Sequence, residues 1–389
     1  MKKIALAIEN FSKDGGGAEA YAVELASTLV DDGWEVHCFG EQWGGKPDAA
    51  IFHLIQIPQF FPSWLKMLLF ALKHRRMVQK QHFDVVMGFG NTICMNVYQS
   101  HGGVHWYSTF RKAYAEKKTW TRFFKKILIL LSPKHHIRHW IESAPFRQKQ
   151  LPRLIAISEM IKRDMVSFYK VDSSLVTVIY NGIDVEKFNK GQSRKYRMPM
   201  RNNLGLSEQE ILFLFVSFEL KKKGIEPLVN AARSLRQRYG DVFKILVVGR
   251  TPYPSLSRLI KRVSLEETVI FTGPYKSVRE MYAAGDVFVL PTYYDACSLV
   301  VLEAMVSGIP PITTDANGIA GIIRNGENGI VLAHPPETHE LAAAMESLLD
   351  KEKREHMAEA ALTLGLQYTN KKNHVAMLEI LNRTRALSK

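Results

Sequence analysis

The feature that most constrains the fold of this chain is a regular alternation of short apolar runs with amphipathic helical patterns. Short apolar runs bounded by turn residues are typical of buried strands, and helical segments between them predict parallel sheets with crossover helices. The sequence is therefore predicted to be an α/β protein. The runs that support this prediction are IALAIE, FDVVMGF, NVYQS, RLIAIS, LVTVIYN, ILFLFVS, FKILVVG, VIFTG, DVFVLP and PPITT.

The domain organisation follows from the place where the alternation breaks. A polar stretch at 190–210 contains no apolar run and is predicted to be a junction. We expect two Rossmann-like domains, at 1–185 and 205–365, and a final helix at 370–389 that can complete the first domain. The apolar residues of this helix are Val375, Leu378 and Leu381. A chain of 389 residues with 46% apolar residues is long enough to bury two cores.

Membrane spans, a signal peptide and disulfides are not expected. The longest apolar runs are far shorter than a membrane span. The start, MKKIALAIENF, lacks the apolar length and the cleavage site of a signal peptide, so it is interpreted as a first buried strand. Cys38, Cys94 and Cys297 lie far apart without metal-ligand spacing, which favours a reducing, cytoplasmic compartment.

The net charge of +14 is concentrated in one segment, 111–153, which holds twelve Lys and Arg residues against two acids. Large apolar side chains are interleaved with these cations, and this mixture favours an anionic membrane surface as partner. The alternative is a helical excursion whose apolar residues pack on the first domain. A nucleic acid is not expected, because no RNA- or DNA-binding motif accompanies the charge. The interleaved residues are Trp120, Phe123, Phe124, Ile127, Leu128, Leu131 and Trp140.

Two loops of the first half follow predicted strands, where such sheets bind ligands. Gly15–Gly17 lead directly into a helical pattern, and the N–H groups of a helix start favour an anion. The spacing fits neither GxGxxG nor a Walker loop, so a flexible loop is an equal interpretation. His101 and His105 flank two glycines after the run NVYQS, and the structural alternative for them is a pair of core histidines.

In the second half, Lys221, Lys222 and Lys223 stand between a predicted strand and a predicted helix. Cations at a helix start are disfavoured by the helix dipole. An anion bound among them would remove that conflict, whereas the alternative is a solvated charged face.

Glu303 lies within the apolar segment LVVLEAMVSG, with Leu299 and Val300 one turn before it. Burying a carboxylate without partners is costly. Glu303 should therefore bind something, either the vicinal diol of a ligand or a Lys or Arg in a core ion pair. Asp295 lies in the preceding loop, and the amides that begin the helix would point at an anion.

These residues resemble a known family. The D-x7-E pattern of Asp295 and Glu303 is similar to the E-x7-E signature of family 4 glycosyltransferases, which have the GT-B fold with the active site in the interdomain cleft. GGGAEAY, VIYNGIDVEKF (178–188) and LKKKG also resemble family motifs, so the resemblance covers about residues 15 to 330. Within the family, the chain resembles lipopolysaccharide-core sugar transferases of the inner membrane face.

The resemblance implies roles for the donor-side residues. Glu303 would hold the ribose of a nucleotide sugar, and Asp295 would hold hydroxyls of the donated sugar. Asp295 departs from the Glu that is usual in the family, which leaves the preferred sugar open. The remaining residues would surround the diphosphate: the backbone amides of Ser298, Leu299 and Val300, and the cations Lys187, Lys222 and Lys223.

The resemblance also assigns residues of the first half. Gly16 and Gly17 would approach the same phosphates from the opposite domain, and His101 or His105 would lie over the donor sugar. It implies a retaining transfer without metal or other cofactor, from a donor that is most commonly a uridine diphosphate sugar.

The implied acceptor is a lipid-linked glycan, met by a cytoplasmic enzyme at the inner face of the membrane. Rival hypotheses are a nucleotide-sugar epimerase, a glycogen-synthase-like polymerase and an inactive relative that acts as a scaffold. An epimerase would turn over nucleotide sugar without any acceptor.

Overall fold

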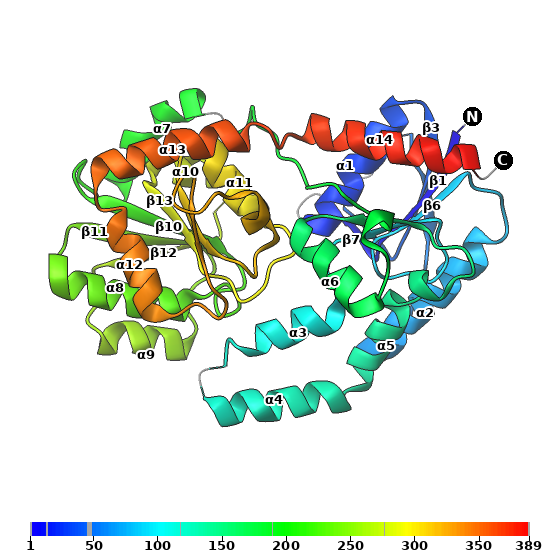
Figure 1. The fold of residues 1–389 in the computed structure, drawn as a ribbon, viewed down its shortest axis with the longest axis horizontal. Coiled ribbons are helices and arrows are strands. Elements are labelled where there is room, and N and C mark those ends of the chain that lie inside the picture. Colours follow the sequence, from blue (N-terminus) through cyan, green and yellow to red (C-terminus); the bar gives the residue numbers. More distant parts are fainter. Residues whose placement is uncertain are drawn as a thin grey trace. The chain divides into compact units, whose positions relative to one another are not determined.

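The computed structural model describes residues 2–12, 15–44, 49–116, 118–188, 190–275 and 277–387. The chain divides into two compact units, one formed by Met1–Tyr180 with Lys371–Lys389 and the other by Asn181–Asn370. Each unit has its own parallel sheet flanked by helices (Figure 1). The expected pair of Rossmann-like α/β folds is confirmed.

The first unit contains a seven-stranded parallel sheet in the order β5-β3-β1-β6-β7-β8-β9. All five apolar runs predicted for this half form strands. β3 and β5 were not predicted, since Glu35 and His37 interrupt the apolar character of β3. The strands are β1 (Lys2–Ala7), β3 (Trp34–Gly40), β5 (Ile51–Leu54), β6 (Val85–Gly88), β7 (Val97–Ser100), β8 (Arg153–Ala156) and β9 (Val176–Val178), beside the small pair β2 (Asn10–Ser12) and β4 (Gln42–Gly44).

The helices of the first unit include the last helix of the chain. α14 (Asn370–Leu387) lies near α1 (Gly17–Asp31) in Figure 1, and its Met377 and Leu381 are buried in the same core as α1. The other helices are α2 (Ser63–Val78), α3 (His105–Ala113), α4 (Thr119–Leu131), α5 (Pro133–Glu142) and α6 (Glu159–Tyr169), with 3-10 turns at Pro145–Arg147 and Ser173–Leu175.

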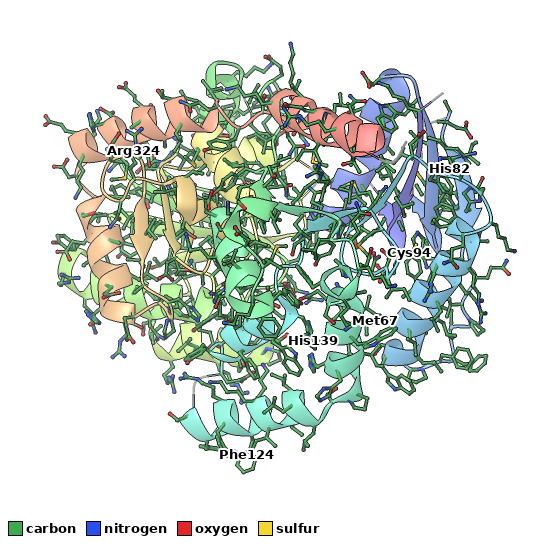
Figure 2. All side chains as sticks on the ribbon, turned by 45° about the vertical axis from the view of Figure 1, so that its right-hand side comes forward. Met67, His82, Cys94, Phe124, His139 and Arg324 are labelled. Atoms are coloured by element: carbon green, nitrogen blue, oxygen red, sulfur yellow. The ribbon has the colours of Figure 1, made fainter. Side chains whose placement is uncertain are left out.

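The basic segment 111–153 contains the end of α3 and the whole of α4 and α5. These helices lie in the chain between the strands β7 and β8 of the first unit. α4 keeps only Ile129 of its apolar residues fully buried. Figure 2 shows Phe124 pointing outward from α4, where it is 56% exposed. The large apolar side chains of α4 therefore do not form a core with the sheet.

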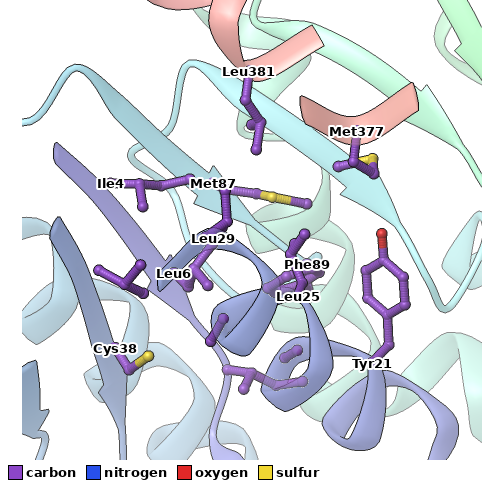
Figure 3. Close-up of a cluster of buried hydrophobic side chains, with 14 of the residues drawn as sticks. Ile4, Leu6, Tyr21, Leu25, Leu29, Cys38, Met87, Phe89, Met377 and Leu381 are labelled. Carbon is purple, nitrogen blue, oxygen red and sulfur yellow. The ribbon is translucent and has the colours of Figure 1, made fainter. Parts of the chain in front are cut away.

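One apolar face of α1 closes the core of the first unit (Figure 3). Tyr21, Leu25 and Leu29 recur one turn apart and are buried. They pack with Ile4 and Leu6 of β1. Burying a side chain such as Leu25 stabilises the fold by about 1.5–3 kcal/mol. This packing fixes α1 on the sheet and thereby positions Gly16, the N-cap of α1.

The second unit has a six-stranded parallel sheet in the order β12-β11-β10-β13-β14-β15. All five runs predicted for this half form strands, and β15 was not predicted. The elements are β10 (Ile211–Ser217), β11 (Phe243–Gly249), β12 (Val269–Gly273), β13 (Val287–Leu290), β14 (Pro311–Thr314), β15 (Ile330–Leu332), α8 (Ile225–Tyr239), α9 (Pro254–Arg262), α10 (Val278–Ala284), α11 (Leu299–Val306), α12 (Thr338–Ser347), α13 (Lys351–Gly365) and a 3-10 turn at Gly318–Ile322.

The polar stretch expected to be a junction is largely helical. α7 (Lys190–Asn203) belongs to the second unit. Its Arg201 is fully buried, donates to the Ala284 carbonyl at 2.9 Å and pairs with Asp286 at 3.0 Å. A buried arginine needs such partners, and they fix α7 to the end of α10.

Candidate active site

The sheet of the second unit reverses its winding between β10 and β13. From β10 the chain proceeds to β11 and β12 on one side, and from β13 to β14 and β15 on the other. In open α/β sheets, ligands bind outside the carboxyl ends of strands at such a switch point. The loops that follow β10 and β13 carry Lys222, Lys223, Asp295 and Ser298, so the fold places these predicted residues at the expected position.

The two loops are joined closely. Gly224 has φ +85, and a Cβ there would lie 2.0 Å from the Pro291 carbonyl oxygen, so only glycine fits. The Tyr293 N–H donates to the Lys222 carbonyl at 3.0 Å. These contacts position Lys223, whose Nζ lies 2.5 Å from Asp295 Oδ2.

The lysine run has protein partners, which changes the interpretation of its charge. Lys223 pairs with Asp295, and Lys222 pairs with Glu219. Carboxylates thus offset the unfavourable position of these cations at the start of α8, and a bound anion is not needed for that purpose. The helix dipole therefore does not by itself require an anion here, and anion binding by Lys222 and Lys223, which lie at the switch point, stays a prediction.

The start of α11 offers backbone donors. The first N–H groups of a helix have no carbonyl partner within it. Those of Leu299 and Val300 donate to no other group in the described part of the chain, and both residues are half-exposed. Asn317, fully buried, orients the turn by accepting a hydrogen bond from the Ser298 N–H at 3.3 Å. The Ser298 hydroxyl oxygen is buried without a partner among the described residues.

Glu303 is half-buried in α11, and its partner is a tyrosine. The Tyr282 hydroxyl donates to Glu303 Oε2 at 2.8 Å. Within the described ranges, Oε1 accepts no hydrogen bond and no ion pair reaches the carboxylate. Burial raises the pKa of Glu303, while the Tyr282 hydroxyl and the charge of Lys187 act to lower it. The core ion pair considered as the alternative is absent from these residues, so one oxygen remains available to a ligand.

Lys187 lies close enough to Glu303 to act on its pKa. It is exposed, with its Nζ 5.4 Å from the centre of the Phe188 ring. Phe188 is buried and packs edge-on against Tyr282 at 5.7 Å. Tyr282 and Lys187 thus both act on the Glu303 carboxylate, Tyr282 by a hydrogen bond and Lys187 by its charge.

In the first unit, the glycine loop stands at the start of α1. Gly16 is the N-cap, and no atom would lie within 4 Å of a Cβ on Gly17. A Cβ on Gly16 would meet only the end of the Glu19 side chain, at 2.4 Å from Oε2. Packing therefore does not require glycine at 17, but a carboxylate lies beside the helix start. An anion could bind there only if Glu19 moved away.

The two histidines have different surroundings. The His101 ring lies 4.7 Å from that of Tyr21 and 5.4 Å from that of Phe89, and its Nε2 is buried without a partner among the described residues. Burial lowers its pKa to about 3, so it is neutral at pH 7. Because Tyr21 lies one turn into α1, His101 is close to the glycine loop.

His105 is held within its own unit. The backbone N–H of His105 donates to both carboxylate oxygens of Glu142, at 3.0 and 2.9 Å. Its ring Nε2 lies 2.8 Å from His135 Nδ1. Burial lowers the pKa of His105 to about 3 and raises that of Glu142 to about 7. The geometry favours His101, with its unpartnered nitrogen, as the histidine that meets a ligand.

Sequence reasoning missed Tyr282 and Asn317. Nothing local marks Tyr282, which lies in α10, 21 positions before Glu303. Asn317 precedes Gly318 in the loop after β14, and an Asn-Gly pair after a strand could have indicated a cap. In the described ranges there is no cluster of three His, Cys, Asp or Glu residues suited to a metal ion, and no helix with the length and apolar character needed to cross a membrane.

The comparisons with known families agree with this architecture. Residues 15–187 match the family described as Glycosyltransferase Family 4, and residues 197–363 match Glycosyl transferases group 1. With its two parallel-sheet units, the chain belongs to these glycosyltransferases of GT-B fold.

Individual relatives extend over most of the chain. It is 25% identical over 345 residues to the lipopolysaccharide glucosyltransferase WaaG of Escherichia coli (strain K12), covering 86% of each chain. The crystal structure of WaaG superposes with a TM-score of 0.80 at 22% identity, over 97% of this chain and 99% of that one. The structure of Anabaena HepE in complex with UDP-glucose gives a TM-score of 0.69 at 18% identity, over 98% and 100%.

Proposed function

We propose that this glycosyltransferase takes a sugar from a uridine diphosphate sugar and transfers it, with retention of configuration, to a hydroxyl of a glycan or glycolipid acceptor. The observation that carries the proposal is Glu303, a half-buried carboxylate with one unbonded oxygen, one turn from the uncovered amides of Leu299 and Val300. A ribose diol and a diphosphate would satisfy both. The complex of HepE, which shares the fold, with UDP-glucose supports the choice of donor.

Each donor-side residue then has a role. Glu303 accepts hydrogen bonds from the ribose hydroxyls, and Asp295 accepts them from the donated sugar. The amides of Leu299 and Val300 bind the diphosphate, whereas the amide of Ser298, predicted to do the same, already donates to Asn317. Its charge is balanced by three cations, Lys187, Lys222 and Lys223.

The reaction follows from these contacts. The bond between the anomeric carbon and the diphosphate breaks, with its electron pair leaving on the phosphate oxygen. The acceptor oxygen bonds to that carbon, and its proton passes to the departing phosphate oxygen. Donors aimed at the leaving group stabilise the charge that develops there, which is electrostatic preorganisation. Lysines and amides supply it, so we infer that the reaction requires neither metal nor another cofactor.

Gly16, Gly17 and His101 of the first unit are proposed to take part in the same reaction. A neutral His101 can hydrogen-bond the donated sugar through its unpartnered Nε2. A glycine at 17 leaves room for close approach of a phosphate. His105 remains the second choice, since its ring is paired with His135.

The experiment that tests this function is a transfer assay with UDP-glucose and lipopolysaccharide lacking the hexoses of its core. We expect transfer by the wild type, and at least a roughly tenfold loss in His101→Ala, the size of one lost hydrogen bond to the reacting sugar. His105→Ala is the matched control and should retain more activity. Conversion of UDP-glucose without acceptor would support an epimerase, and full activity of both variants would remove this loop from the chemistry.

A membrane surface is proposed as a second partner, contacted through residues 111–153 at the cytoplasmic face. Along α4, the side chains of Trp120, Phe123, Phe124, Leu128 and Leu131 are each at least 56% exposed. Exposed aromatic and aliphatic side chains beside cations suit the headgroup region of an anionic bilayer. A lipid-linked acceptor would be met there.

Salt-dependent binding to vesicles is the expected result for this segment. Each cation near an anionic surface contributes about 1 kcal/mol, so the wild type should float with anionic liposomes at low salt and be released at high salt. A variant with Lys117, Lys118, Lys125 and Lys126 changed to Glu should remain behind; Lys117 itself lies outside the described residues.

The matched control carries the same charge change elsewhere, at Arg76, Lys80, Arg163 and Lys371, all exposed on the first unit. It should float like the wild type. Equal loss in both variants would indicate a general effect of net charge, and no flotation of the wild type at low salt would contradict the membrane contact.

A further inference from the structure

A pocket of about 520 Å³ lies in the first unit, where β3 and β5 end. It opens beside Glu41, which follows β3, and Gln42, which begins β4. On the other strand it opens beside the segment from Leu54, the last residue of β5, to Gln59. Its volume is within the range of about 300–1,000 Å³ that is typical of small-ligand sites. Because the sheet is parallel, these carboxyl ends share an edge with those of β1 and β7, which lead to the glycine loop and to His101.

The pocket contains a carboxylate that its own unit does not satisfy. Glu41 is half-buried, and its side chain forms neither a hydrogen bond nor an ion pair within the described part of the chain. Burial and the charge of Glu9 raise the pKa of Glu41, whereas Lys66 and Lys73 act in the opposite direction. Such a group gains from a ligand that donates hydrogen bonds.

The other lining groups are amides and apolar side chains. Gln42, Gln56 and Gln59 are exposed, and each carries both donors and an acceptor. Lys73 contacts the Gln56 carbonyl at 2.5 Å, and Lys66 donates to Gln59 Oε1 at 2.8 Å, so these two lysines hold the loop after β5. Leu54, Ile57 and Pro58 add an apolar wall.

We propose that this pocket binds a sugar unit of the acceptor, with Glu41 and Gln56 determining acceptor specificity; the proposal rests on the function proposed above. A lining that combines a carboxylate, amides and aliphatic groups matches a pyranose, whose hydroxyls donate and accept while its C–H face is apolar. A phosphate would offer acceptors but no donors to the Glu41 carboxylate, and the two lysines beside it are already bonded to the loop after β5. A fatty acyl chain would leave the amides unbonded. The pocket lies at the same edge of the sheet as the ends of β1 and β7, which lead to the glycine loop and to His101.

Kinetics with variants of the pocket test the proposal. In the transfer assay with UDP-glucose and core-truncated lipopolysaccharide, we expect Glu41→Ala and Gln56→Ala each to raise the acceptor KM at least about tenfold. The donor KM should stay within about twofold, because the donor contacts other residues. Controls are Asp31→Ala at the exposed end of α1 and Gln150→Ala, which lines a pocket at the opposite edge of the same sheet.

A binding measurement separates failure of the pocket from failure of the proposed function. Saturation-transfer NMR with the core oligosaccharide released from the same lipopolysaccharide should give signals with the wild type and Gln150→Ala. These signals should be lost with Glu41→Ala and Gln56→Ala. Oligosaccharide binding without transfer would contradict the proposed reaction and keep the pocket. Acceptor KM values and NMR signals that match those of the controls would overturn the pocket.

Discussion

Replacing Lys223 by Ala is expected to lower kcat by about 100–1,000-fold while changing the donor KM much less. Removing one preorganised donor to developing charge has an effect of this size in other enzymes. The charge on the departing diphosphate grows toward the transition state, so a cation aimed at it contributes more there than in the ground state. Steady-state kinetics with UDP-glucose and the lipopolysaccharide acceptor measure both constants.

The ion pair between Lys223 and Asp295 makes a structural control necessary. Lys223→Ala leaves the Asp295 carboxylate, which is 20% exposed, without its cation, and this lowers stability by about 1–3 kcal/mol. Lys221→Ala is the control, because it removes a lysine side chain of the same length and charge from the same run. The double variant Lys223→Ala/Asp295→Asn removes the unpaired charge. If it restored activity together with melting temperature, Lys223 would be a structural lysine only.

Local patterns predicted the strands well, because their apolar runs are short and bounded by turn residues. They missed two strands of the first sheet, β3 and β5. β3 has the sequence WEVHCFG, in which Glu35 pairs with Lys3 and contacts His37. Glu35 lies opposite Lys3 on the neighbouring strand β1, and the sequence does not reveal that these two strands pair. The last helix shows the same limit. Val375 was expected on its apolar face but is 59% exposed, and Met377 is buried instead.

Partners that are distant in the chain explain why the site was predicted only in part. The position of Lys223 after β10 could be predicted, but Asp295 is 72 residues away, and nothing in the sequence joins the two. The helix-dipole argument therefore lacked the carboxylate that offsets the cation. For Glu303, local spacing indicated that its carboxylate would be buried, but its partner Tyr282 comes from another helix. Residue type and local spacing were predictable, whereas pairing depended on the tertiary fold.

Glu303→Gln is expected to weaken binding of UDP-glucose by about 10–100-fold, which corresponds to about 1–3 kcal/mol for a lost charged hydrogen bond. The amide keeps the size of the side chain but offers a single acceptor oxygen and no charge to the ribose hydroxyls. Calorimetric titration of wild type and variant with UDP-glucose measures the difference. Unchanged affinity would show that Glu303 does not hold the ribose.

The stability of the same variant separates a ligand-binding carboxylate from a structural one. Burial raises the pKa of Glu303, so the folded protein binds its proton more tightly than the unfolded chain does. The protonated Glu303 therefore stabilises the folded state. This stabilisation is complete below the pKa of Glu303 in the unfolded chain, and it is lost as the pH rises through the pKa of Glu303 in the folded protein. At neutral pH the charged wild type therefore carries a cost that Gln lacks, and Glu303→Gln should melt at the same temperature or higher without ligand. A large fall in melting temperature would instead show that the Glu303 carboxylate is structural, through its hydrogen bond with Tyr282.

Tyr282→Phe is the matched variant for the pH dependence. The Tyr282 hydroxyl lowers the pKa of Glu303, so its removal should raise that pKa further. Donor binding requires the ionised carboxylate, so affinity should fall as the pH is lowered and Glu303 becomes protonated. In Tyr282→Phe this fall should begin at a higher pH than in the wild type. In Glu303→Gln, which has no carboxylate to titrate, this fall should disappear. If all three proteins lost donor affinity at the same pH, another group would control the titration and Glu303 would not be the residue that binds the ribose.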